Sequence, residues 1–546
     1  MGIHMPASVP AIISIIACHK ARAAYVPFDP DYPAQRLQLM IEDTATPVIL
    51  TDTNLEQLET DSCTIWQWEA IQDKLAEEID ANLNLAYTLT DPAYIIYTSG
   101  STGKPKGVVC GHTGVFNLQR SFDQWGARPP QNISALWTSL TFDVSVYEIF
   151  SAFISGGSLH IVPAEIRPDA AQLFTWMAQQ HIQNAYLPPF MVEPFHQWLQ
   201  DKTHTSSLQH LLVGVEPLAE QTLAAIQGSI PDLILINAYG PTEATVCTTS
   251  YRVLAESSRT GSAPIGRPLH NSQVYLLNDR MELVPVGVTG ELYIGGMGLA
   301  HGYLNRPELT AERFVTNPFS AKPEARLYRT GDLVKYLPDG NIQFIGRTDF
   351  QLKVRGFRVE LGEIESHLLA LPGVAAGVIM PQTASDGQIM LIAYFVAEEG
   401  VSLNQQDLQD ALNQALPSYM VPAIWVALDK MPRTLNDKID RKALPLLNLE
   451  TLERTTPFVP PRNPTEMELH AIWQSLLKVD EISIHDNFFE LGGHSLLAMQ
   501  LVSHLQKTFN VNLPFCATFL SKAASLKWPR SSIRHKRKKR WPPSRW

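Results

Sequence analysis

The sequence lacks the features that define membrane-spanning, disulfide-stabilised and zinc-binding proteins. None of its apolar runs reaches the about 18 uninterrupted residues that a membrane helix needs. The first 30 residues hold an apolar patch, Val9–Ala17, but not the charged, apolar and cleavage-site order of a signal peptide. The five cysteines form no CxxC pair and are scattered over the chain at Cys18, Cys63, Cys110, Cys247 and Cys516. These absences predict no membrane association, no structural metal or disulfide framework, and a place in the reducing cytoplasm.

Negative charge dominates the chain except at its C-terminal end. The formal net charge is −11, yet the last 26 residues carry ten Lys and Arg and no acidic residue. The other 520 residues therefore carry a net charge of −21. A body with this charge repels polyanions, so we expect no nucleic-acid partner for it.

A chain of 546 residues exceeds one compact core, so several folding units are expected. Residues 90–350 alternate helical patterns with apolar runs that end in Gly-rich turns, namely AYIIYTSG (93–100), QHLLVGV (209–215) and LILINAYG (233–240). This alternation predicts an α/β fold whose ligands lie where strands end. Between Gly261 and Gly346 the spacing shortens and predicts a β-rich part.

The second half of the chain divides into smaller units. Residues 350–446 have the pattern of a compact α+β unit, and residues 447–464 are polar and Pro-rich, as a linker is. A helical unit is predicted from Thr465, where TEME offers a capping box, and a second helix is predicted near Ser495. The predicted units are therefore 1–349, 350–446 and 465–514, followed by the basic residues 515–546.

The loop YTSGSTGKPKG (97–107) is the sharpest local signal. Its small residues let backbone N–H groups approach phosphate oxygens, while hydroxyls and Lys104 add donors and charge. It is not a Walker A loop, because Pro105 follows the lysine and Thr98 stands at the first glycine. GGMGLAHG (295–302) misses the dinucleotide fingerprint, since His301 takes the third glycine's place. Taken alone, the loop could also be a plain flexible turn.

This loop and the motifs after it resemble the adenylate-forming superfamily, specifically the adenylation domains of nonribosomal peptide synthetases. The later blocks occur in the family's order as FDVS (142–145), NAYGPTE (237–243), GELYIGGMGLAHGYLNRPELT (290–310), YRTGDL (328–333), GRTDFQLKVRGFRVELGEIE (346–365) and NDKIDR (436–441). The resemblance implies a large α/β core with a β-rich subdomain over 1–349 and a small α+β C-terminal subdomain over 350–446. A linker and a partial all-α carrier helical bundle over 465–514 would follow.

The resemblance implies ATP and Mg²⁺ as cofactors and assigns roles in the reaction to particular residues. Joining a carboxylate to an α-phosphate requires cations that neutralise both anions. The implied catalytic residues are Lys438 as the bridging lysine, Glu243 as the Mg²⁺ ligand, and Arg347 beside ribose and phosphate. Asp332 would accept from the ribose hydroxyls, and Tyr239 would stack on adenine. The residues implied to bind the nucleotide are Thr98, Ser99, Gly100, Ser101, Thr102, Gly103, Lys104, Asn237, Ala238, Tyr239, Thr242 and Asp332.

Asp143 stands where the family keeps the carboxylate that pairs with the substrate's α-ammonium group. A carboxylate buried without that partner is costly, so Asp143 favours an α-amino acid over a fatty or aryl acid. The other implied pocket residues are uncharged: Val144, Tyr147, Tyr186, Leu212, Gly214, Ala238, Val246 and Cys247. This set resembles pockets for branched aliphatic substrates, so we predict Leu, Ile or Val.

DNFFELGGHSLLAMQLV (486–502) resembles a carrier-protein attachment site. A phosphopantetheinyl transferase would install 4′-phosphopantetheine on Ser495. GGHSLL is not a hydrolase nucleophile elbow, because Leu497 stands where the final glycine belongs and no strand precedes Gly493. Asp349 resembles the hinge aspartate about which the small subdomain swings, although alone it would be a plain loop residue.

The sequence departs from the family at both ends. The family's opening portion before KARAAYVPFDP (20–30) is missing, and Arg22 and Asp437 replace usual glycines. After Pro514 the carrier's last helical stripe is absent. IRHKRKKR in the tail could be a nucleic-acid or localisation patch. We prefer to interpret residues 515–546 as an out-of-frame or truncated, disordered terminus.

We therefore predict an amino acid adenylating ligase, a fragment of a multimodular synthetase whose neighbouring modules are partners. Two alternatives stay open. One is a stand-alone acyl-CoA ligase, which Asp143 and the carrier motif oppose. The other is a non-catalytic remnant that binds ATP without turnover. No HHxxxDG signature occurs, so the chain is not expected to form peptide bonds.

Overall fold

The structure is a computed structural model in which the chain forms two compact units. Unit 1 comprises Met1–Pro163, Ala170–His367 and Asp410–Pro417; unit 2 comprises Ala164–Asp169, Leu368–Gln409 and residues from Ser418 onward. The residues that the structure describes are 1–53, 55, 63–100, 103–126, 128–257, 259–349, 351–354, 356–383, 389–434, 439–445, 458–477, 479, 481–484, 486, 488, 491, 501, 504–505 and 508–509. In this part of the chain, no helix is long and apolar enough to cross a membrane.

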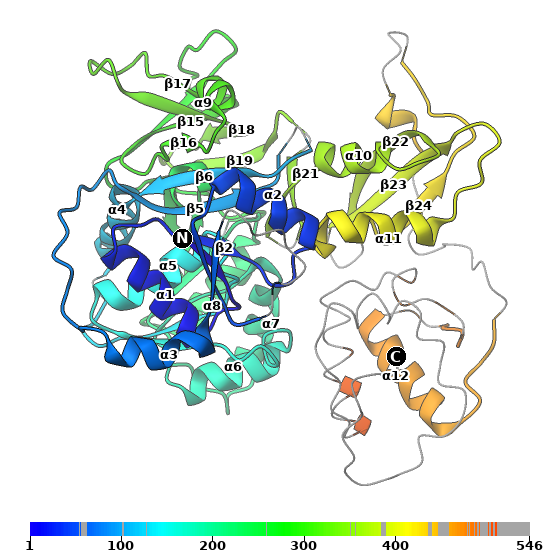
Figure 1. Cartoon of the computed structure of the whole chain (residues 1–546), viewed down its shortest axis with the longest axis horizontal. Helices are drawn as coiled ribbons and strands as arrows, with labels where there is room; N and C mark the ends of the chain where they lie inside the picture. The colour runs from blue at the N-terminus through cyan, green and yellow to red at the C-terminus, as the bar shows by residue number, and fades with distance from the viewer. Residues whose placement is uncertain are drawn as a thin grey trace. The chain divides into compact units, whose positions relative to one another are not determined.

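A seven-stranded sheet forms the centre of unit 1 (Figure 1). Its order is β13 (Arg267–Pro268), β12 (Thr249–Arg252), β11 (Ile234–Tyr239), β10 (His210–Gly214), β9 (Asn184–Tyr186), β7 (Ile133–Leu136) and β8 (Ser158–Ile161). Strands β7 to β11 run parallel to one another, whereas β12 and β13 pair in antiparallel fashion at the other side of the sheet. The helices in this part of the chain are α4 (His112–Phe122), α5 (Val144–Ile154), α6 (Ala170–Gln179), α7 (Pro189–Gln200) and α8 (Glu220–Ser229). Strands β9, β10 and β11 are largely buried between the helices, which confirms the predicted α/β layers.

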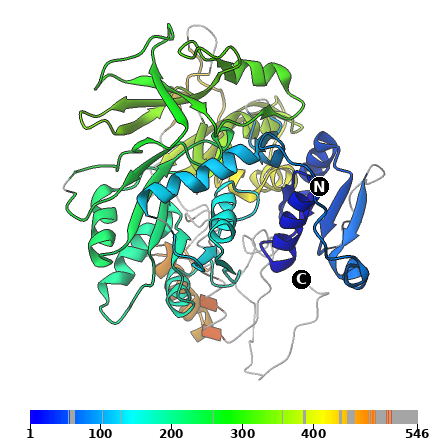
Figure 2. The same cartoon turned by 90° about the vertical axis from the view of Figure 1, so that its left-hand side faces the viewer.

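Two smaller sheets come from the first third of the chain. One is parallel in the order β2 (Val26–Phe28), β1 (Gly2–His4), β3 (Val48–Thr51) and β4 (Thr64–Gln67). It is accompanied by α1 (Val9–Lys20), α2 (Ala34–Thr44) and α3 (Trp68–Glu77), which gather with it in blue at one side of unit 1 (Figure 2). The other is antiparallel in the order β16 (Gly302–Tyr303), β6 (Lys106–Gly111) and β5 (Pro92–Thr98).

The connection from β5 to β6 is the predicted phosphate loop. A Cβ atom on Gly100 would stand 1.9 Å from the carbonyl oxygen of Lys104, so only glycine fits there. Gly103 has φ +83, in the left-handed region that glycine favours. The loop therefore turns tightly and brings its backbone N–H groups to the end of β5.

The β-rich part predicted between Gly261 and Gly346 is confirmed as a five-stranded antiparallel sheet. Its order is β14 (Ser272–Leu277), β15 (Gly290–Gly296), β18 (Arg326–Tyr336) and β17 (Phe314–Thr316), with β19 (Ile342–Arg347) also on β18. Helix α9 (Pro307–Arg313) precedes β17. Short 3-10 turns in unit 1 are η1 (Asp123–Trp125) and η2 (Thr242–Ala244).

A hairpin follows this sheet and still belongs to unit 1. It consists of β20 (Gln351–Val354) and β21 (Phe357–Glu360), and it leads into α10 (Leu361–Leu369). The C-terminal subdomain was predicted to span 350–446, whereas contacts group the described residues between Gln351 and His367 with unit 1. The hinge at Asp349 stays a prediction, because a hinge is defined by movement between two arrangements.

Unit 2 contains the three-stranded sheet of the predicted α+β subdomain and the described part of the carrier region. The sheet has the order β22 (Val374–Thr383), β23 (Ile389–Ala397) and β24 (Ile424–Ala427). Helix α11 (Gln405–Ala415) crosses the boundary between the units, and η3 (Ser418–Met420), η4 (Arg441–Ala443) and α12 (Pro464–Leu477) follow. In the carrier region, Trp473, Ile482, Phe488, Leu501 and Leu505 form one buried cluster.

The predicted capping box at Thr465 is wrong by two residues. Asn463 Oδ1 accepts the N–H of Glu466 at 2.9 Å, and Glu466 Oε2 accepts the N–H of Arg462 at 2.6 Å. The cap therefore begins before Pro464, whose missing N–H suits the first turn of α12. The sequence offered both possibilities, since Asn and Thr are both good N-caps.

Candidate functional site

The phosphate loop carries donors and acceptors that are engaged by a segment far along the chain. Ser99 Oγ donates to the carbonyl oxygen of Arg358 at 2.8 Å, and the Gly100 N–H donates to Oε2 of Glu363 at 2.8 Å. Thr98 Oγ1 is buried and has no hydrogen-bond partner among the described residues. An unsatisfied hydroxyl of this kind fits a loop whose partner is a bound anion.

The two lysines of the loop lie in different environments. Lys104 is exposed and lines a cavity of about 290 Å³. Lys106 is buried at the start of β6, with its Nζ 3.7 Å from Oε1 of Glu243 and 4.8 Å from the ring centre of Tyr303. Burial and then Arg358 lower the pKa of Lys106 to about 8. Lys104 stays the predicted phosphate-contacting lysine, and Lys106, which was not predicted, opens the buried run KGVVCG.

Glu243, the predicted Mg²⁺ ligand, is fully buried in the turn η2 and is surrounded by donors. Oε2 lies 2.7 Å from Nη1 of Arg358, while the hydroxyl of Tyr303 donates to Oε1 at 2.7 Å and Lys106 approaches the same oxygen. Burial alone would raise the pKa of Glu243, but Arg358 and Lys106 outweigh it, so the pKa is lowered and the carboxylate is charged.

The surroundings of Glu243 do not fit a bound magnesium ion in this arrangement. Mg²⁺ requires unshared oxygen ligands at short, octahedral distances. Both carboxylate oxygens of Glu243 are taken by protein donors. Elsewhere in the described ranges, no group of three or more His, Cys, Asp and Glu side chains could hold a metal.

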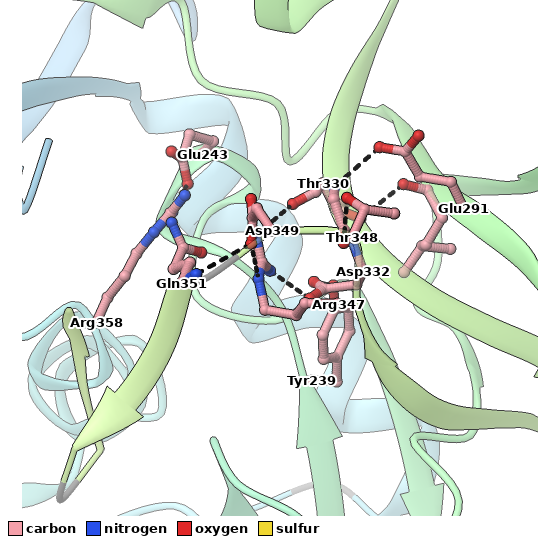
Figure 3. A network of polar contacts seen from close by, with 12 residues as sticks. Tyr239, Glu243, Glu291, Thr330, Asp332, Arg347, Thr348, Asp349, Gln351 and Arg358 are labelled. Carbon is pink, nitrogen blue, oxygen red and sulfur yellow. Dashed lines mark hydrogen bonds and ion pairs between the residues drawn. The ribbon is translucent and has the colours of Figure 1, made fainter. Parts of the chain in front are cut away.

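The residues predicted to bind adenosine form one connected network (Figure 3). The hydroxyl of Tyr239 and Nη1 of Arg347 donate to the two oxygens of Asp332. Arg347 also holds Asp349 with Nε and Nη2 at 2.7 and 2.9 Å, and donates to the Thr330 carbonyl at 3.1 Å. Burial raises the pKa of Tyr239, and Asp332 adds to this. Asp332 is therefore oriented from both sides by residues of β11 and β19.

Two residues of the NAYGPTE motif are engaged in other ways. Asn237 Nδ2 donates to the carbonyl oxygen of Pro264 at 2.8 Å, so its amide fixes a neighbouring loop. Thr242 Oγ1 donates to Oδ2 of Asp143 at 2.7 Å. The motif thus joins the predicted nucleotide residues to the predicted amino-acid residues.

Asp143 lies directly before α5, with its carboxylate buried at the edge of the central sheet. The residue is 6% exposed, and no ion pair joins it to a basic side chain in the described part of the chain. Burial raises the pKa of Asp143 to about 6, although the Thr242 hydroxyl and the charges of Lys353 and Arg358 oppose this rise. A cationic partner would stabilise the charged form of a carboxylate buried in this way.

The structure brings the predicted pocket residues together near the C-terminal ends of β9, β10 and β11. Tyr186 pairs with Leu212 in register between β9 and β10, and Gly214 pairs with Ala238 between β10 and β11. A Cβ atom on Gly214 would stand 2.0 Å from the Ala238 carbonyl oxygen, so glycine is required there. One buried apolar cluster contains Val144, Tyr147, Tyr186, Leu212, Ala238, Val246 and Cys247, each at most 9% exposed.

The hydroxyl groups of the two pocket tyrosines differ. Tyr147 donates to Oδ1 of Asn184 at 3.1 Å. The hydroxyl of Tyr186 is buried and has no partner among the described residues. Among the seven predicted pocket residues in this cluster, Tyr186 therefore carries the one hydroxyl that has no partner in the described part of the chain.

The hairpin β20–β21 and the start of α10 supply residues that the sequence analysis missed. The Gly356 N–H donates to Oε1 of Glu216 at 2.7 Å, and the Glu360 N–H donates to Ser99 Oγ at 3.2 Å. Arg36 Nη1 lies 2.7 Å from Oε1 of Glu363, and the two side chains are 4% and 0% exposed. These contacts join positions far apart in the sequence, so no local pattern could reveal them.

Four predicted site residues lie outside the described residues. They are the loop residues Ser101 and Thr102, the bridging lysine Lys438 and the attachment serine Ser495. Their predicted roles stay predictions.

Comparison with known families gives three matches along the chain. Residues 1–304 match the AMP-binding enzyme family, residues 363–438 match the AMP-binding enzyme C-terminal domain, and residues 468–517 match the phosphopantetheine attachment site. Tyrocidine synthase 1 from Brevibacillus parabrevis is 40% identical over 510 residues, and malpinin synthetase from Mortierella alpina is 39% identical over 511 residues. These alignments cover 92% and 91% of this chain, which spans only 45% and 6% of the lengths of the two relatives.

Solved structures agree with these matches. An NRPS protein containing adenylation and PCP domains, bound to a vinylsulfonamide inhibitor, aligns with a TM-score of 0.76 and 26% identity over 96% of this chain and 86% of that one. A holo four-domain nonribosomal peptide synthetase bound to AMP and glycine aligns with a TM-score of 0.55 and 36% identity, covering 96% of this chain and 38% of that one. The chain belongs to the AMP-binding enzyme family, in the arrangement of an adenylation domain followed by a carrier domain that nonribosomal peptide synthetases use.

Proposed function

We propose that this chain activates a neutral, branched aliphatic amino acid with ATP, releases pyrophosphate, and transfers the aminoacyl group to a phosphopantetheine thiol on Ser495. The activity would serve nonribosomal peptide synthesis together with neighbouring modules and a phosphopantetheinyl transferase. The scattered free cysteines favour a reducing, cytoplasmic setting for it.

The observation that carries the proposal is the buried, unpaired carboxylate of Asp143. Its pKa of about 6 reflects burial, and an α-ammonium group would supply the missing positive partner. A carboxylic acid without an amine would leave this charge buried and unpaired. Amino acids are therefore favoured as substrates over fatty or aryl acids.

The side-chain preference rests on the apolar cluster around Asp143. Its members bear no charge, and Gly214, at the end of β10, has no side chain. An apolar pocket separates substrates that differ by one methylene by about 1–3 kcal/mol. The pocket thus favours Leu, Ile or Val as a class and discriminates weakly within it.

The nucleotide would be held by this chain's own polar residues. Asp332, oriented by Tyr239 and Arg347, would accept the ribose hydroxyls, and the phosphate loop with Thr98 and Lys106 would hold the phosphates. Lys438 would neutralise the reacting carboxylate and α-phosphate.

The deciding experiment is amino-acid-dependent exchange of pyrophosphate into ATP. We expect exchange with Leu, Ile or Val, and none with 4-methylpentanoate, which keeps the shape of Leu but lacks the amine. Lys438→Ala should abolish exchange while the protein stays folded. Exchange with the amine-free acid would instead identify an acyl-CoA ligase, and nucleotide binding without any exchange would identify a non-catalytic remnant.

A further inference from the structure

The connection from β7 to α5, residues 137–143, ends at Asp143, and its first residues are held by the helix that follows. Glu148 of α5 is 1% exposed, and its carboxylate accepts the backbone N–H groups of Trp137 and Thr138 at 3.0 and 3.1 Å. These bonds fix only the start of the connection. The part that leads directly into α5 is held by other contacts.

A carboxylate from a different sheet holds this second part of the connection. The Phe142 N–H donates to the Ser139 carbonyl oxygen at 3.0 Å, which closes a turn over residues 139–142. The Ser139 hydroxyl donates to Oδ2 of Asp29 at 3.0 Å, and the Thr141 hydroxyl lies 2.9 Å from Ser139 Oγ and 3.5 Å from the same oxygen of Asp29. Asp29 follows β2 and is 110 positions away from Ser139. One side chain next to the first sheet thus anchors the turn that precedes the helix.

Asp143 occupies the N-cap position of α5, but its carboxylate does not cap the helix. An N-cap aspartate normally has an extended backbone, and its side chain accepts an N–H group of the first helical turn. Asp143 instead has φ −63 and ψ −22, which is a helical conformation, and makes no side-chain hydrogen bond to the helix. Its Oδ2 accepts the Thr242 hydroxyl at 2.7 Å. The local backbone therefore keeps this carboxylate from the role that its position favours.

We propose that Asp29 is a positioning residue for amino-acid binding: by anchoring the turn over residues 139–142, it keeps Asp143 out of the helix cap and available to the substrate's α-ammonium group. The inference rests on the proposed function, because it assumes that Asp143 binds this group. Asp29 acts through the turn and does not itself contact the substrate.

The two conformations open to Asp143 explain why an anchor is needed. The turn is adjacent to Asp143 in the chain, so it sets the direction in which the backbone enters that residue. In the extended conformation of an ordinary cap, the carboxylate would accept N–H groups of α5 and would not be free for an amine. A hydrogen bond to a charged acceptor, such as that from the Ser139 hydroxyl to Asp29, is stronger than a neutral one and stabilises the turn against this alternative.

Removal of Asp29 should free the turn without unfolding the protein. Leu140, inside the turn, is 3% exposed and belongs to the main apolar core. The bonds of Glu148 at the start of the connection do not involve Asp29. The side chain of Asp29 is only half-buried, so its truncation opens no enclosed cavity. The expected change is therefore confined to the turn and to Asp143.

The first experiment measures the amino-acid dependence of pyrophosphate exchange with the full chain at saturating ATP. We expect Asp29→Ala to raise KM for the preferred amino acid about tenfold, short of the about 100-fold loss that a misplacement of 1 Å can cause, with kcat and the KM for ATP little changed. Asp29→Asn keeps an acceptor oxygen for the Ser139 hydroxyl and should lie close to the wild type. The matched control is Asp31→Ala, which removes a carboxylate that makes no hydrogen bond to residues 137–143 in the described structure.

A double-mutant cycle separates positioning from general damage. If Asp29 acts through Asp143, Asp29→Ala should change KM for the amino acid by less than about twofold in the Asp143→Asn background. The same tenfold rise in both backgrounds would refute the positioning role, because independent effects add. An unchanged KM in Asp29→Ala alone would refute it as well.

Hydrogen exchange by mass spectrometry tests the anchor without any substrate. Peptides covering residues 139–143 should exchange faster in Asp29→Ala, because the N–H groups of Thr141 and Phe142 are bonded to Ser139. Peptides within α5 should exchange no faster. Unchanged exchange over residues 139–143 would overturn the inference, whatever the activity. Absence of pyrophosphate exchange in the wild type with every amino acid would instead refute the proposed function, while the hydrogen-exchange result would still decide whether Asp29 anchors the turn.

Discussion

The predicted amino-acid end and the predicted phosphate end of the candidate site are built in different ways. At the amino-acid end, Asp143 and the pocket residues come from α5 and from adjacent strands of one sheet, so the fold alone gathers them. At the phosphate end, the donors and acceptors are joined by ion pairs between the loop, η2 and the segment 351–367. The first end is gathered by neighbouring elements of one sheet, whereas the second is held by ion pairs and hydrogen bonds between segments far apart in the sequence.

This difference has an energetic counterpart. The predicted pocket residues are buried apolar side chains near one carboxylate, Asp143, which has no ion pair with a described basic residue. The phosphate end consists of buried charges that are already neutralised by Arg358, Lys106 and Arg36. Removing a charge should therefore affect binding of the amino acid at one end and stability of the protein at the other.

The largest expected effect is that of Glu243→Gln on stability. It leaves Arg358 and Lys106 buried without their carboxylate, and breaking a buried pair in this way costs about 3–5 kcal/mol. Chemical denaturation followed by tryptophan fluorescence should show this loss, with Arg259→Gln as an unaffected control. A Glu243→Gln protein as stable as the wild type would mean that the charges at the phosphate end are not coupled as described.

The next effect is that of Asp143→Asn on substrate use. Removing one partner of a buried charge pair should lower kcat/KM for the amino acid roughly 100-fold. Stability and nucleotide affinity should change little, because no ion pair links Asp143 to the described basic residues. Pyrophosphate exchange would measure kcat/KM for the amino acid, and calorimetric binding of α,β-methylene-ATP would measure the nucleotide affinity. An equal loss of nucleotide affinity would contradict the separation of the two ends.

A smaller effect is expected from pH. Because the pKa of Asp143 is raised to about 6 by burial, its carboxylate becomes protonated as the pH falls through that value. The protonated form cannot pair with the substrate's ammonium group, which stays charged over this range. We expect kcat/KM for the amino acid to fall about tenfold per unit of pH below the pKa.

Thr242→Val gives the control for the pH profile. The Thr242 hydroxyl stabilises the charged form of Asp143, so its removal should raise the pKa and move the profile to higher pH. A flat profile between pH 5 and 7 in the wild type would show that Asp143 does not bind the ammonium group.

The same contrast explains what the sequence could and could not predict. The pocket residues, Asp332 and Arg347 were identified from motifs, and the register of β9, β10 and β11 places the strand residues side by side. Lys106 was not among the predicted site residues, although the apolar residues that follow it in KGVVCG indicated a buried strand. Arg358 and Glu363 were within a recognised motif, but their partners lie more than 100 positions away.

Local signals also failed where two residues offered the same chemistry. Asn463 and Thr465 are both good caps for α12, and only the structure shows that Asn463 accepts the Glu466 N–H. Lys104 and Lys106 both belong to the phosphate loop, and only the fold buries the second. The sequence therefore specifies which kinds of groups are present, while long-range packing decides which of them are buried and bonded.

The smallest expected effect, that of Tyr186→Phe, tests the substrate class at the amino-acid end. The Tyr186 hydroxyl is buried without a partner in the described structure, so an aliphatic substrate gains nothing from it. Removing an unsatisfied buried hydroxyl should then change kcat/KM for Leu, Ile or Val by less than about threefold and should not lower stability. Pyrophosphate exchange with the wild type and the variant would measure this. A loss of tenfold or more would mean that the true substrate carries a polar group that bonds this hydroxyl, which would replace the branched aliphatic class by a polar one while leaving the role of Asp143 intact.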